Sequence, residues 1–266
     1  MPEPALAGTW LGRIDPKKLN LMNGIASKGH QPESTDSLPR GALASRRHTL
    51  IFLAISLAVT VVSALNAPHG SATGAPASSD QLLLVYLWLI GLEWLWVRFV
   101  YKGMQAHGHS LLEFIGHPWF TPRQLAVDLM YAALALGFSY ILFVGVDHFM
   151  KHGDAVTNPL LPTVPSGVAA ITLWTILSLS AGICEEVVFR GYLQRQLAAF
   201  SGSASLAILG QAIVFGIAHG YEGVDAVIRI VVYGLAIGLL AQWRGNIRAC
   251  VLAHASWDIL AGFGLM

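Results

Sequence analysis

Long apolar runs separated by short polar connectors dominate the chain after residue 48. A helix needs roughly 20 apolar residues to cross the hydrocarbon core of a bilayer, and seven segments approach that length, the fifth being short for it. These candidate spans are 49–66, 82–100, 125–146, 168–184, 206–218, 227–243 and 247–265. The pattern predicts an all-α polytopic membrane protein with about seven transmembrane helices.

Composition strengthens this prediction. Of the 266 residues, 55% are apolar and 12% are charged, which is about half the charged fraction of a soluble domain. The lipid bilayer is therefore the expected environment. The net charge of +1 gives no argument for a nucleic-acid partner. The two cysteines, Cys184 and Cys250, lie in or beside apolar segments and form neither a disulfide framework nor a CxxC metal motif.

Residues 1–48 differ from the rest because they show no sustained apolar periodicity. The first long apolar run begins near Leu50, too far from the start for a secretory signal. We therefore expect a flexible cytoplasmic tail over 1–48, N-terminal transmembrane helices over 49–165, and a C-terminal transmembrane core over 166–266. A weakly interfacial arm around residues 6–11 is the alternative for part of the tail.

Lysine and arginine placement predicts the orientation. The first 48 residues carry seven basic residues, whereas the connector at 67–80 carries none. Basic residues also follow the fourth span and lie between the sixth and seventh, and only Arg229 fits the alternation poorly. This pattern places the N-terminus of the multi-pass protein in the cytoplasm. The lack of a recognisable targeting signal is compatible with the plasma (inner) membrane, which is the localisation we expect.

Charged side chains interrupt the fourth apolar run, where Glu185 and Glu186 are followed by Arg190. Residues four apart share a helix face, so Glu186 is expected to pair with Arg190 while Glu185 points elsewhere. A carboxylate in an apolar cavity without a cationic partner is a candidate general base. The alternative is that all three form one ion-pair cluster at the membrane surface.

Two further pairs with helical spacing follow, Phe215 with His219 and His254 with Asp258. Burying such groups separately in three apolar segments would cost on the order of several kcal/mol in total. We therefore predict that they converge on one polar cavity among the four C-terminal helices. Glu93, which interrupts the second span, is a further candidate to line it.

The depth of His219 constrains the arrangement. If the fifth span enters near Ser205, His219 lies about 21 Å along the helix at 1.5 Å per residue. The groups meet only if residues 187–200 stay partly in the bilayer or the fifth helix is tilted. We predict that the fourth helix continues past Glu186, which places the acid pair in mid-helix.

Three short segments resemble the motifs of a known family. EEVVFR at 185–190 is similar to Glu-Glu-x-x-x-Arg, FGIAH at 215–219 to Phe-x-x-x-His, and HASWD at 254–258 to His-x-x-x-Asn/Asp. These motifs belong to the CPBP intramembrane proteases, which include the CAAX prenyl endopeptidases of the Ras-converting type and bacteriocin-immunity relatives. The resemblance covers roughly residue 168 to the C-terminus.

The resemblance implies an intramembrane endopeptidase acting on membrane-associated proteins or peptides. Glu185 would activate a water molecule that His219 helps to position. His254 and Asp258 would stabilise the oxyanion or complete the polar site. In a supporting role, Glu186 and Arg190 would hold the architecture, together with Phe215.

Asp258 departs from the asparagine frequent at this position among prenyl endopeptidases. An asparagine amide donates a hydrogen bond to an oxyanion, whereas an ionised aspartate only accepts. Asp258 is therefore protonated, or orients His254, or helps to bind a metal.

The need for a metal stays open at this point. Glu185, His219, His254 and Asp258 are all zinc-ligand types, but the helical HExxH spacing is absent. The family has been described both as metalloproteases and as glutamate-dependent proteases, and we favour the metal-independent form. Two other classes fit the same residues, namely a non-proteolytic scaffold or immunity protein and a transporter with a buried proton relay.

Overall fold

The computed structural model describes residues 41–66, 79–116, 121–149 and 167–265. Within these ranges all regular structure is helical, without strands, which confirms the predicted all-α polytopic fold. The α-helices are α2 (Arg46–Asn66), α3 (Ser79–Gln105), α4 (Leu112–Ile115), α5 (Pro122–Phe149), α6 (Val168–Glu185), α7 (Gln194–Ser201), α8 (Ala204–Ala218), α9 (Val224–Arg244) and α10 (Arg248–Gly262). A π-helix, η1 (Glu186–Leu193), joins α6 to α7, and a 3-10 helix, η2 (Gly220–Glu222), follows α8.

Among the described residues, five helical segments are long and apolar enough to cross a membrane, by length and composition. They are 46–65, 81–105, 122–148, 168–201 and 224–244. The apolar helix α8, which corresponds to the fifth predicted span, is shorter, as expected. Helix α10, which corresponds to the seventh span, is also short, and this was not expected. These helices follow the order of the predicted spans, and the chain is a multi-pass membrane protein.

The fourth span is one continuous helical segment over residues 168–201, which confirms that the helix continues past Glu186. It ends at Gly202, whose φ of +68° is a left-handed conformation that glycine adopts without a Cβ penalty. Ser203 then caps α8, its side-chain oxygen accepting from the Leu206 N–H at 3.3 Å. The two helices therefore form a tight hairpin.

This hairpin brings Glu185 and His219 to the same depth. Gly202 lies midway between them in sequence, and α7 packs against α8. Because an α-helix rises by a constant distance per residue, positions equally far from the turn lie at similar heights. The long fourth helix therefore allows His219 to lie at the depth of Glu185, as the predicted site requires.

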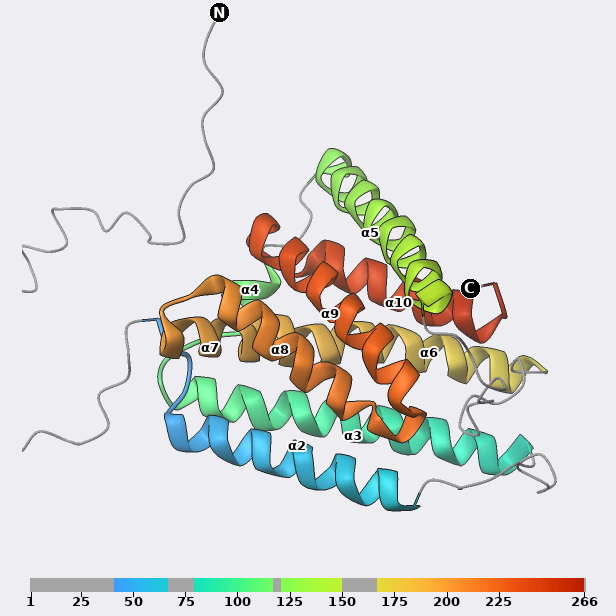
Figure 1. Ribbon diagram of the computed structural model, residues 1–266, viewed down its shortest axis with the longest axis horizontal. Coiled ribbons are helices and arrows are strands. Elements are labelled where there is room, and N and C mark those ends of the chain that lie inside the picture. The colour runs from blue at the N-terminus through green and yellow to red at the C-terminus, as the bar shows by residue number, and fades with distance from the viewer. Residues whose placement is uncertain (1–40, 67–78, 117–120, 150–166, 266) are drawn as a thin grey trace, which may run out of the picture. The chain divides into compact units, whose positions relative to one another are not determined.

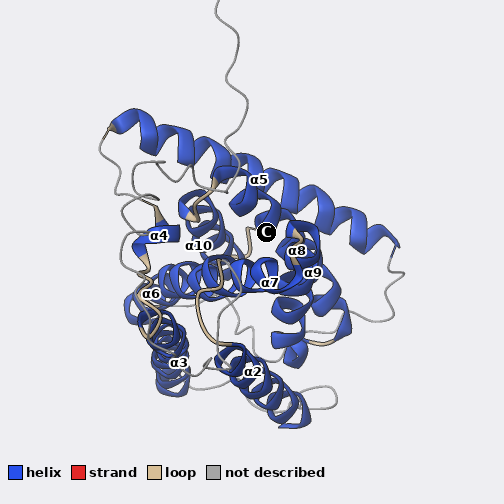
Figure 2. Ribbon diagram, turned by 90° about the vertical axis from the view of Figure 1, so that its left-hand side faces the viewer, coloured by secondary structure: helices blue, strands red, loops and turns tan. Residues whose placement is uncertain are grey.

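The segment 168–201 lies at the centre of the bundle (Figures 1 and 2). Its first part, α6, packs between α3 and α10, while α8 pairs with α9. Helix α2 covers α8 and η2, and α5 packs on α9 and α10. Helices from both predicted transmembrane domains therefore build one bundle.

The end of the predicted N-terminal tail packs into this bundle. Residues 42–44 are buried, and the Leu43 N–H donates to Oε1 of Gln196 at 2.7 Å. The amide of Gln196 also donates to the Thr49 hydroxyl at 3.0 Å. Residues 1–40 lie outside the described part of the chain.

Basic residues from distant segments meet at one end of the bundle. The guanidinium of Arg46 lies 5.7 Å from the ring centre of Phe200, and that of Arg195 lies 5.3 Å from Phe114. Arg195 also donates to the carbonyl of Gly245 at 3.4 Å. The start of α2, the end of α7 and the α9–α10 turn therefore share one end, which we call the basic end.

Arg229, which fits the alternation poorly, has a different partner. Its Nε lies 3.0 Å from Oδ1 of Asp147, and both side chains are partly exposed. The ion pair joins the beginning of α9 to the end of α5. Because Asp147 neutralises its charge, Arg229 can lie at the end of the bundle opposite the basic end.

Helices α6 and α10 approach closely at Gly182. A Cβ atom added there would lie 2.8 Å from both the backbone nitrogen and the Cβ of Ala255. Small residues allow such close backbone approach between membrane helices. Gly182 lies one helical turn before Glu186, and Ala255 directly follows His254 on α10. This contact therefore sets the spacing between the polar residues of the two helices.

We expect Gly182→Ala to destabilise the protein by about 1–3 kcal/mol, because overpacking forces the two helices apart. Gly91→Ala is the matched control, since a Cβ there meets no atom within 4 Å and alanine favours a helix by up to about 1 kcal/mol. Thermal unfolding of both variants in detergent measures the difference. Equal melting temperatures would show that this close contact does not set the helix spacing.

Candidate active site

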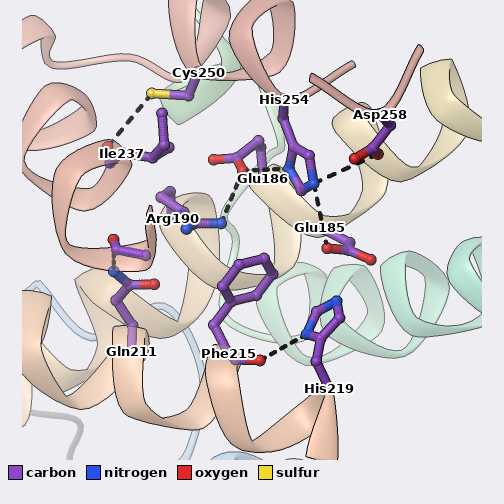
Figure 3. A network of polar contacts seen from close by, with 11 residues as sticks. Glu185, Glu186, Arg190, Gln211, Phe215, His219, Ile237, Cys250, His254 and Asp258 are labelled. Atoms are coloured by element: carbon purple, nitrogen blue, oxygen red, sulfur yellow. Dashed lines mark hydrogen bonds and ion pairs between the residues drawn. The ribbon is translucent and has the colours of Figure 1, made fainter. Parts of the chain in front are cut away.

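The carboxylate of Glu186 is the centre of the polar network (Figure 3). Its Oε1 accepts from Nη1 of Arg190 at 2.8 Å and lies 2.8 Å from Nδ1 of His254. The side chains of Glu186 and Arg190 are 0% exposed. Because an ionised carboxylate only accepts, Nδ1 is the donor in this contact. One oxygen atom thus joins the fourth helix to α10.

Phe215 lies between the arginine and the two histidines. The Arg190 guanidinium stands 4.4 Å from the centre of the Phe215 ring, a cation–π distance. The same ring packs edge-on against His219 at 4.9 Å and His254 at 6.0 Å between centroids. Phe215 therefore fixes the relative positions of three polar residues without a hydrogen bond from its side chain.

Glu185 has a different environment from Glu186. Its Oε2 lies 3.7 Å from Nε2 of His254, and Oδ2 of Asp258 lies at the same distance from that nitrogen. The side chains of Glu185 and Asp258 are 23% and 27% exposed. Glu186 is therefore sequestered in an ion pair, while Glu185 and Asp258 are partly exposed on the other side of His254.

His219 ends α8 and enters the same region. Its Nδ1 lies 2.9 Å from the carbonyl oxygen of Phe215, so Nδ1 donates to that carbonyl and Nε2 is left to face the site. Figure 3 shows its ring directed toward Glu185. The ring of Phe215 contacts both His219 and His254, and so links His219 to the rest of the network.

The structure thus brings the predicted residues together with one redistribution of roles. Glu185, Glu186, His254 and Asp258 are in direct contact distance, and His219 joins them through Phe215. The orientation of His254, one of the roles considered for Asp258, is provided through Nδ1 by Glu186. Asp258 instead faces Nε2, and its backbone carbonyl accepts from Trp174 at 3.1 Å.

Tyr233 on α9 is a site residue that the sequence did not reveal. It is buried, and its ring centroid lies 5.6 Å from that of His254. Its hydroxyl has no hydrogen-bond partner among the described protein atoms, which is also true of Oε2 of Glu186 and Nε of Arg190. Tyrosine on an apolar helix gives no signal of its own, because its packing role is common.

Glu93 lies at the edge of the same network. Its Oε2 accepts from the hydroxyl of Ser180 at 2.6 Å. Ser180 stands on α6, somewhat more than one turn before Glu185, so this pair joins α3 to the site helix. The hydroxyl of Ser180 also lies 3.8 Å from the buried thiol of Cys184.

The donor set does not fit a metal as arranged. Among the described residues, no group of three or more His, Cys, Asp or Glu side chains is placed to hold a metal ion. Nδ1 of His254 is already engaged by Glu186. We therefore derive no step through a metal.

Comparison with known proteins gives a family match for the C-terminal part of the chain. Residues 167–260 match the family described as Type II CAAX prenyl endopeptidase Rce1-like, which confirms the resemblance seen in the motifs. The matched segment begins just before α6, ends within α10 and contains all three motifs; the family is a protease family. No curated protein and no solved structure matches the chain.

We expect Glu186→Ala to destabilise the protein by about 3–5 kcal/mol, because it leaves Arg190 buried without its ion-pair partner. Glu185→Ala should cost much less, since Glu185 is partly exposed and makes no short contact to a cation. Thermal unfolding of the purified variants compares the two. Similar losses for both would contradict the unequal roles of the adjacent acids.

Proposed function

We propose that the protein is an intramembrane endopeptidase that hydrolyses membrane-associated proteins or peptides. The observation that carries the proposal is the pairing of an accessible acid, Glu185, with a histidine whose other nitrogen is held by the buried Glu186. The match of residues 167–260 to a protease family supports a peptidase.

In this mechanism Glu185 is the general base. It takes a proton from a water molecule that Nε2 of His219 helps to position, and the water oxygen attacks the carbonyl carbon of the scissile peptide bond. When the tetrahedral intermediate breaks down, the C–N bond is cleaved and Glu185 returns the proton to the leaving amine. A positioned acid–base group contributes roughly 10²–10⁴-fold to such a reaction.

His254 stabilises the oxyanion of the intermediate. Protonated histidine has two donors, and Nδ1–H is already directed at Glu186. Nε2–H then lies between the carboxyl groups of Glu185 and Asp258, where charge would develop on the substrate oxygen. An ionised Asp258 only accepts, so it completes the polar site beside His254 without being the oxyanion donor.

The proposed environment is a plasma (inner) membrane with the N-terminus in the cytoplasm. The basic end of the bundle supports this orientation, because positively charged segments remain on the cytoplasmic side. A substrate would reach Glu185 from within the bilayer or from its surface.

We expect Glu185→Gln to lower peptide cleavage by about 10²–10⁴-fold, because the amide cannot accept the proton of water. Glu113→Gln is the matched control, since this exposed carboxylate belongs to α4 and pairs with His109. Mass spectrometry of membrane peptides from cells carrying each variant identifies the products that depend on Glu185.

Three outcomes separate the proposal from its alternatives. Products that disappear in Glu185→Gln and persist in Glu113→Gln support the peptidase. Normal biological activity in both Glu185→Gln and His219→Ala would instead indicate a non-proteolytic scaffold or immunity protein. Proton-dependent flux into vesicles without peptide products would indicate a transporter.

Activity should survive chelation, because the mechanism assigns every proton transfer to protein side chains. The purified enzyme is incubated with a strong chelator and assayed on a peptide shown to depend on Glu185. Complete loss of activity that zinc restores would refute the metal-independent mechanism.

A further inference from the structure

A groove on the outer side of the bundle, formed by α5 and α9, has a strongly apolar surface. It encloses about 400 Å³ and is lined by side chains such as Leu134 and Phe138 of α5 and Leu239 and Trp243 of α9. These four side chains are exposed, and none of the residues that line the groove takes part in the Glu185 network. Figure 1 shows α5 crossing this side of the bundle.

A second pocket of about 450 Å³ lies where α5 begins and has a different character. Its lining includes Thr121 and three arginines, namely Arg123, Arg244 and Arg248. The buried Asp128 forms ion pairs with Arg244 at 2.8 Å and with Arg248 at 2.9 Å. One carboxylate among three guanidinium groups leaves the pocket positively charged.

The two pockets are neighbours. The Arg244 guanidinium of the charged pocket stands 4.5 Å from the ring centre of Tyr131, which lines the groove. Trp243 precedes Arg244 on α9, and Tyr131 follows Val127 by one turn on α5. A positively charged pocket therefore lies next to an apolar groove.

We propose that these two pockets form a binding site for an anionic phospholipid. The phosphate would lie against Arg123, Arg244 and Arg248. One acyl chain would follow the groove, in which residues 131–138 of α5 provide a length of roughly 10 Å.

The position of the site in the bundle favours this ligand. Arg244 and Arg248 flank the α9–α10 turn, which belongs to the basic end. Trp243 stands at this end, where tryptophan side chains commonly mark the level of lipid headgroups. Basic pockets between membrane helices on the cytoplasmic side recognise anionic headgroups, which that leaflet supplies.

Native mass spectrometry of the purified full-length protein tests the proposal, using dioleoyl phosphatidylglycerol and dioleoyl phosphatidylcholine as probes. We expect the anionic lipid to bind more tightly by at least fivefold, because each arginine near a headgroup contributes about that factor. Inorganic phosphate at the same concentration should not displace the lipid, since phosphate cannot use the apolar groove.

Two matched pairs of variants locate the binding. Arg123→Gln should weaken phosphatidylglycerol binding about fivefold, while Arg47→Gln, at an exposed arginine outside the pocket, should not. Ala135→Phe, which fills the groove, should weaken both lipids, while Ala133→Phe, at an exposed position beyond it, should leave both unchanged.

Equal affinity for the two lipids, or equal effects of Arg123→Gln and Arg47→Gln, would overturn the proposal. Displacement by inorganic phosphate would assign the arginines to a free anion instead of a lipid. Arg123 is exposed, so its substitution tests the headgroup contact even if Ala135→Phe fails to fold.

Discussion

The buried carboxylate of Glu186 is the interaction on which the rest of the site depends. A charge at membrane depth is tolerated only when it is paired and hydrogen-bonded. Glu186 meets this condition with two partners at 2.8 Å, Arg190 on its own helical segment and His254 on α10. Arg190 in turn lies over Phe215 on α8, so one ion pair aligns three segments that are far apart in sequence.

This arrangement gives two adjacent acids different chemistry. Because Glu186 is occupied, its neighbour Glu185 is left at the accessible edge, facing the second nitrogen of His254. Regular α-helix gives way to a π-helix at Glu186, and π-helical turns occur frequently at functional sites. The glycine contact between α6 and α10 then brings the histidine close enough for the network to form.

The sequence predicted what depends on local periodicity. Spacing of four residues placed Glu186 beside Arg190, and apolar length predicted the spans. The depth of His219 predicted the continuous fourth helix. Contacts that arise only from packing were not predictable, such as Glu186 with His254 and the approach of Tyr233 from α9.

A double-mutant cycle between Glu186→Gln and His254→Ala tests the central interaction most directly. Unfolding free energies of the two single variants and the double variant are compared with those of the unchanged protein. The account predicts that the two effects are non-additive by about 1–3 kcal/mol, as for residues that share a buried hydrogen bond. Additivity within about 0.5 kcal/mol would show that Glu186 does not hold His254.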